Sequence, residues 1–276
     1  MAKKKDNEMS FLEHLEELRW HIIKSLVSIF VVAIVAFIFK DILFNKILLA
    51  PKSPEFITYR LFCKVAEIVK IPRLCIQTVP MELISIKMSG QFSMHIMVAF
   101  VAGFIVAFPY VFYQFWRFIV PALYPKEKSV ARGAVAVSSL LFLLGVAFGY
   151  FIITPLTIQF FSSYSVSDEV TNQINLISFV STNASVLLSC GVIFELPILV
   201  YFLSKIGLIT PKFLKKYRKH ALVLILFLAA VITPPDIFSQ LVVSLPLIIL
   251  YEVGIIISRR IEKRRKKQEV IDSSGS

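Results

Sequence analysis

Residues 22–39 read IIKSLVSIFVVAIVAFIF, an apolar stretch that contains a single charged residue, Lys24. A bilayer core is about 30 Å thick and is crossed by about 20 residues of α-helix. The stretch is therefore long enough to span a membrane. It is longer than the apolar core of a secretory signal and is followed by no clear small-residue cleavage site, so we expect a retained helix.

The whole chain has a composition typical of a polytopic membrane protein. Of its 276 residues, 57% are hydrophobic and 17% are charged, which lies well outside the average for soluble domains. We predict an all-α fold with six transmembrane helices in a single membrane domain, 1–276. The expected spans are 22–39, 96–115, 134–153, 176–203, 219–233 and 241–257. The last two are short, and prolines within the spans predict kinks or helix ends, and hence a concave bundle.

The distribution of basic residues predicts the orientation of the chain. The net charge is +12, but the basic residues gather at one side of the predicted spans, which argues against nucleic acid as the partner. Two loops on the other side, 158–175 and 233–240, contain no Lys or Arg. By the positive-inside rule both termini, including the basic tail 258–276, are cytoplasmic. The outer loop 40–87 carries eight basic residues and does not fit this pattern, although the rule weakens for longer loops.

The outer loop is expected to cap the bundle with short amphipathic helices. It contains Cys63 and Cys75, which in an oxidising compartment form a disulfide and otherwise stay as two reduced thiols; the sequence leaves both possibilities open. Cys190, inside the fourth span, is expected to be a small packing residue. The apolar spacing of 81–95 predicts that the second span extends outwards as a helix.

One acidic residue lies deep within a span. Glu195, in the segment CGVIFELPILVYF at 190–202, costs on the order of 3 kcal/mol at such a depth, so it should face the bundle or a wet cavity. Two roles are open for Glu195: it is part of a functional site, or it is a protonated side chain that is hydrogen-bonded to a neighbouring helix. For Glu252, nearer the cytoplasmic boundary, we favour a role in helix packing. No metal motif, catalytic triad or phosphate loop is present, so we predict no enzyme, no metal and no cofactor.

Four segments carry a resemblance to a known family. They are FLEHLEELRWHI at 11–22, YQFWRFIVPALYPKEK at 113–128, FELP at 194–197 and TPPDIFSQ at 233–240. Together with the six predicted spans they resemble TatC, the core membrane subunit of the twin-arginine protein translocase. The resemblance covers the chain from about Ser10 to Arg260. One departure is His21, at a position where the family commonly has a second basic residue after Arg19.

The resemblance implies a function and a set of partners. Such a protein binds twin-arginine signal peptides and, with TatA-type and TatB-type single-span subunits and further copies of itself, exports folded proteins across the bacterial cytoplasmic membrane, driven by the proton-motive force. The implied signal-binding acids are Glu17 and Glu127, and paired carboxylates suit the planar forks of two arginines. Leu15, Arg19, Phe118 and Tyr124 match family motif positions around these acids.

The same resemblance implies a second region, where partner helices dock within the membrane. It comprises Glu195, Thr233, Asp236 and Gln240, whose polar groups need partners in lipid. Two other classes of function are weighed against this one. A proton-coupled secondary transporter would use Glu195 as its ion site, and a membrane scaffold would tolerate charge reversal at Glu17 and Glu127.

Overall fold

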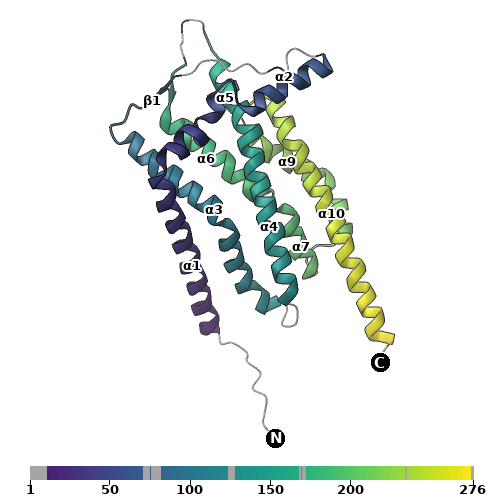
Figure 1. The fold of residues 1–276 in the computed structure, drawn as a ribbon. Coiled ribbons are helices and arrows are strands. Elements are labelled where there is room, and N and C mark those ends of the chain that lie inside the picture. The colour runs from purple at the N-terminus through teal and green to yellow at the C-terminus, as the bar shows by residue number, and fades with distance from the viewer. Residues whose placement is uncertain are drawn as a thin grey trace.

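The computed structural model describes residues 11–70, 75, 82–123, 128–167, 169, 172–233 and 235–274. Within these residues the fold is a bundle of long helices, as predicted (Figure 1). The start of α1 (Phe11–Ile38) and the end of α10 (Ile237–Ser274) lie at the same end of the bundle, while α2 (Ile57–Val69), α5 (Thr154–Ser163) and β1 (Leu83–Ile84) lie at the other (Figure 1). We call these the termini end and the outer end.

The helices follow the apolar stretches of the sequence. The long elements are α1 (Phe11–Ile38), α3 (Gly90–Leu123), α4 (Lys128–Phe148), α6 (Leu176–Ile193), α7 (Leu196–Lys205), α9 (Arg218–Ile232) and α10 (Ile237–Ser274). Five helical stretches of the described chain are long and apolar enough to cross a membrane, and α6 with α7 counts as one of them. α9 has 15 residues and covers only about 22 Å, less than a typical bilayer core.

Short elements complete the outer end. They are the π-helical turn η1 (Ile42–Leu48), the 3₁₀ turn η2 (Ala50–Lys52), α2 (Ile57–Val69), a second π-helical turn η4 (Gly149–Ile153) and α5 (Thr154–Ser163). β1 (Leu83–Ile84) pairs in parallel with β2 (Ile174–Asn175). At the termini end, α8 (Pro211–Lys216) precedes α9.

One prediction about helix bounds was wrong. The segment 81–95 is not a continuous helix, because Leu83 and Ile84 pair with β2 and α3 begins only at Gly90. The expected span 241–257 lies within α10, which continues into the basic tail as far as Ser274. Its run of Glu, Lys and Arg residues consists of good helix formers.

The prolines act in two ways. Pro155 and Pro197 lie in the first turns of α5 and α7, where a missing N–H costs nothing. α3 and α10 instead continue through Pro109 and Pro246. Pro197 therefore divides the predicted fourth span into α6 and α7, with Glu195 at the junction.

The core has two main parts. Near the outer end, Leu43, Val98 and Val180 belong to a cluster that joins η1, α3 and α6. Deeper in the bundle, Ile153, Cys190, Ala229 and Val243 belong to a cluster that joins η4, α6, α9 and α10. Many large apolar side chains remain exposed on the outer faces of α1, α4 and α9, as expected where lipid surrounds the helices.

Candidate functional site

Glu17 lies near the start of α1, at the termini end, and has a basic neighbour. Its Oε1 is 3.9 Å from Nε2 of His21, one turn along the helix, and the Glu17 side chain is 38% exposed. His21 is buried, and its Nδ1 lies 2.6 Å from Oε1 of Gln114 on α3. An amide oxygen only accepts hydrogen bonds, so Nδ1–H is the donor.

The predicted neighbours of Glu17 lie on different faces. The Phe118 ring of α3 is 6.3 Å from the His21 ring, so Phe118 lies beside the Glu17–His21 pair. Leu15 and Arg19 are both exposed and are two residues from Glu17, a spacing that places side chains on different faces of a helix. The structure therefore brings Phe118 close to this pair through His21, and leaves Leu15 and Arg19 on an open surface.

The second predicted acid, Glu127, and Tyr124 lie outside the described residues. The helices on either side of them are described: α3 ends at Leu123 and α4 begins at Lys128. Both of these helix ends lie at the termini end, as does the start of α1 that carries Glu17 (Figure 1).

Glu195 faces the interior of the bundle. Ser138 of α4, which is fully buried, donates a hydrogen bond of 2.7 Å to Glu195 Oε2. The other carboxylate oxygen, Oε1, is buried and accepts no hydrogen bond in the described part of the chain. A buried oxygen without a donor is unfavourable, so this carboxyl group has capacity for one more partner.

Polar residues at the turn from α9 to α10 cap the two helices, and one of them joins the helices. Thr233 Oγ1 donates to the Ala229 carbonyl at 2.8 Å, and Asp236 Oδ1 accepts from the Ser239 N–H at 2.8 Å at the start of α10. Gln240 Nε2 donates to the Leu226 carbonyl across the hairpin at 3.2 Å. Asp236 Oδ2 is buried and is not hydrogen-bonded within the described residues.

The outer cap is tied to the bundle by specific bonds. Cys63 and Cys75 form a disulfide, which is one of the two possibilities left open by the sequence. Thr58 of α2 donates to the Phe151 carbonyl of η4. Tyr59 is buried and donates to the Pro51 carbonyl at 2.8 Å, and burial raises the pKa of its hydroxyl. These bonds fix α2 over the outer end of α4.

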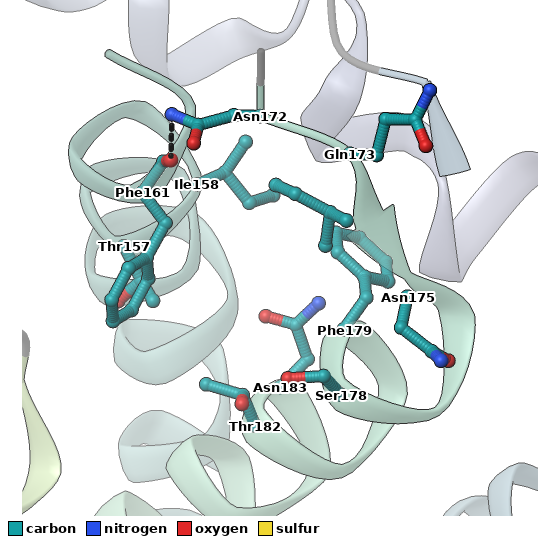
Figure 2. Close-up of a pocket in the computed structure, with 11 residues that line it drawn as sticks. Thr157, Ile158, Phe161, Asn172, Gln173, Asn175, Ser178, Phe179, Thr182 and Asn183 are labelled. Carbon is teal, nitrogen blue, oxygen red and sulfur yellow. Dashed lines mark hydrogen bonds between the residues drawn. The ribbon is translucent and has the colours of Figure 1, made fainter. Parts of the chain in front are cut away.

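A pocket with both apolar and polar lining residues opens between α5 and α6 near the outer end (Figure 2). Its volume is about 410 Å³. Figure 2 shows Thr157 and Asn183 on its wall, and the Thr157 hydroxyl and the Asn183 amide nitrogen are buried without a hydrogen-bond partner in the described chain. Its polar lining consists of amides and hydroxyls, with no charged side chain among the lining residues that are described. Such a lining suits water or a neutral polar group.

Comparisons with known proteins agree with the helical architecture. The family model for the Sec-independent protein translocase protein TatC matches residues 13–246. A TatC protein of Blattabacterium sp. subsp. Periplaneta americana is 42% identical over 95% of this chain and 100% of its own length.

The chain belongs to the TatC family.

Further relatives and solved structures agree with this assignment. The TatCy protein of Bacillus subtilis is 30% identical over 100% of this chain and 99% of its own length. A crystal structure of a TatC twin-arginine translocase receptor in DDM has a TM-score of 0.69 and 32% identity, and it covers 89% of this chain and 99% of that one. The resemblance of the four sequence segments to TatC is confirmed, and a component of a protein translocase has a transport role.

The sequence does not predict two residues of the site in this TatC protein, His21 and Gln114. His21 stands out in the sequence only as a departure from the family motif, although it is one helical turn from Glu17. Gln114 stands in a mostly apolar stretch, which was a signal that its amide needs a partner. Their pairing across 93 positions is not visible in the sequence.

Proposed function

We propose that this chain is the receptor for twin-arginine signal peptides and the core of a translocase that exports folded proteins across a bacterial cytoplasmic membrane. In this proposal the chain crosses the membrane six times and both termini are cytoplasmic. The observation that carries it is the Glu17 carboxylate, partly exposed at the termini end and held beside His21.

The chemistry of recognition follows from charge and geometry. An arginine guanidinium has a planar fork of N–H donors that matches a carboxylate, and such charge-assisted bonds are among the strongest hydrogen bonds. Glu17 binds one arginine of the signal peptide and Glu127 binds the other. His21 acts as a positioning residue, because its bond to Gln114 fixes the imidazole against which the Glu17 carboxylate rests.

Partner subunits of the TatA and TatB type dock within the membrane in this proposal. Glu195 Oε1 and Asp236 Oδ2 are buried and lack hydrogen bonds within the described chain, so a polar group on an arriving helix gains a bond at either site. The short α9 lies beside Asp236 and leaves about 8 Å of a typical bilayer core uncovered. The proton-motive force drives the transport step.

Membership of a protein translocase family favours this function over a small-molecule transporter. In a proton-coupled transporter based on Glu195, neutralising Glu17 would leave transport unchanged. In the translocase, neutralising Glu17 weakens signal-peptide binding and export together.

The test is binding of a labelled twin-arginine signal peptide to the full chain in lipid nanodiscs. Glu17→Gln keeps the size of the side chain and removes its charge, and we expect affinity to fall about tenfold or more, since a hydrogen bond to a charged group contributes roughly 1.5–3 kcal/mol. Glu127→Gln should have a similar effect. The matched control is Glu16→Gln, on the exposed adjacent position, which should leave affinity within about twofold.

A peptide with two lysines in place of the arginines tests whether binding needs the planar guanidinium groups or only their positive charge. It should bind the wild-type chain more weakly and be less sensitive to Glu17→Gln. Unchanged affinity for the twin-arginine peptide in the Glu17→Gln, Glu127→Gln double variant would overturn the proposed site.

A further inference from the structure

A groove of about 420 Å³ opens between α4, α7 and α10 at the termini end. Val137, Ile198 and Ile257 contribute apolar side chains, one from each helix. Arg260 and Arg264 of α10 also line the groove, together with Tyr201 of α7. The groove therefore combines an apolar part with a basic part. Neither part belongs to the Glu17 site or to the polar residues around Glu195.

The position of the groove relative to the bilayer follows from the length of α10. Between Ile237 and Ile257 the helix rises roughly 30 Å, the thickness of a bilayer core. Arg260 and Arg264 are placed about 5 Å and about 10 Å beyond Ile257 along the helix axis. These distances correspond to the headgroup layer, while Val137, which is half exposed, lies on the apolar part of α4.

The two arginines present an uncompensated positive charge to the groove. They are one helical turn apart and both are exposed, and neither forms an ion pair within the described part of the chain. The nearby Glu262 pairs with Lys266 at 3.1 Å and lines a separate depression beside α8. No acidic side chain is among the described residues that line the groove.

We propose that this groove binds an anionic phospholipid of the termini-side leaflet. The guanidinium groups of Arg260 and Arg264 bind the phosphodiester, because planar donors match phosphate oxygens, and prefer a headgroup without an ammonium group that would neutralise the phosphate charge. One acyl chain packs along Val137 and Ile198, a contact that free phosphate cannot make. Basic pockets between membrane helices at this level are suited to acidic headgroups. The bound lipid would join α4 to α10, which pack mainly on other helices.

The test is lipid binding to the purified full chain, measured by native mass spectrometry with dioleoylphosphatidylglycerol and, separately, dioleoylphosphatidylcholine. We expect a tightly bound phosphatidylglycerol that phosphatidylcholine does not displace. Arg260→Gln with Arg264→Gln should weaken phosphatidylglycerol binding on the order of thirtyfold, given the usual contribution of each basic residue near an anionic surface. The matched control, Lys263→Gln with Lys267→Gln, makes the same charge change at exposed positions of α10 outside the groove.

A second variant tests the shape of the groove without changing its charge. Gly133 lines the groove, and a Cβ added there meets no atom within 4 Å. Gly133→Leu should fill the groove and reduce lipid binding about tenfold, while thermal unfolding shows that the fold is kept. Equal binding of the two lipids, retention of binding in the double arginine variant, or displacement of the lipid by millimolar inorganic phosphate would each overturn the proposal.

Discussion

His21 and Gln114 determine how the charged start of α1 is arranged. The buried imidazole has one hydrogen bond to α3 and one acidic neighbour. A buried ring nitrogen that loses its partner is unfavourable by about 1–3 kcal/mol. The Glu17 carboxylate therefore depends on a bond that it does not make itself.

Replacing Gln114 tests this arrangement. Gln114→Leu should lower the free energy of unfolding by about 1–3 kcal/mol, because His21 Nδ1 is left buried without an acceptor, and signal-peptide affinity should fall severalfold. The midpoint of thermal unfolding and peptide binding measure the two effects. Gln91→Leu, at an exposed position of α3, is the matched control. If both variants behave alike, the bond does not position Glu17.

Glu195 has a structural role that is separable from any role in transport. Glu195→Ala should destabilise the chain by about 1–3 kcal/mol, because the fully buried Ser138 hydroxyl loses its acceptor. Glu195→Gln keeps an oxygen for Ser138 and should change stability by less than about 1 kcal/mol. Export of a folded reporter and binding of the signal peptide are then measured with membrane vesicles that contain the Glu195→Gln chain. Reduced export with unchanged peptide binding would support the proposed docking role. Full export would contradict that role.

At the scale of elements, small residues set the distance between α4 and α6. A Cβ at Gly145 would lie 2.5 Å from the Cys190 carbonyl oxygen, and one at Gly191 would lie 2.6 Å from the Phe142 ring. Close approach of backbones through small residues is how membrane helices pack when the hydrophobic effect no longer drives association. The same contact places Ser138 of α4 near the α6–α7 junction.

Gly145→Ala tests this packing. The added methyl group meets a backbone carbonyl that cannot rotate away, so we expect a loss of about 2 kcal/mol or more in stability, seen as a lower midpoint of thermal unfolding. Gly133→Ala, on the same helix but with open space around its Cβ, should be neutral or stabilising by up to about 1 kcal/mol, since alanine favours helix. Similar losses in both variants would contradict tight α4–α6 packing.

At the scale of the whole molecule, specific covalent and hydrogen bonds stabilise the outer cap and attach it to the helix bundle. The Cys63–Cys75 disulfide closes a loop with a sequence separation of 12, which by loop entropy stabilises the folded chain by about 3 kcal/mol. Cys63→Ser with Cys75→Ser should therefore lower the midpoint of thermal unfolding in oxidising buffer. Reductant should lower the midpoint of the wild type but not of this variant. An unchanged midpoint in the double variant would show that the bond adds no stability.

The sequence by itself determined the apolar helices, the family and the presence of acids where charge is costly. These features are local, because hydropathy is read along one stretch of about 20 residues and the motifs are contiguous. It did not predict where α3 begins, because the pairing of Leu83 and Ile84 with β2 joins segments far apart in the chain. For the same reason it did not predict that His21 bonds to Gln114.

Only the tertiary structure decided which polar groups meet. Ser138 reaches Glu195 because glycines bring α4 against α6, and Arg260 and Arg264 line a groove only because α4 and α7 form its other walls. A side chain's neighbours across helices depend on the rotation and spacing of those helices, which packing determines jointly for the whole bundle. Charge and hydropathy placed the candidates along the chain, and packing determined which of them act together.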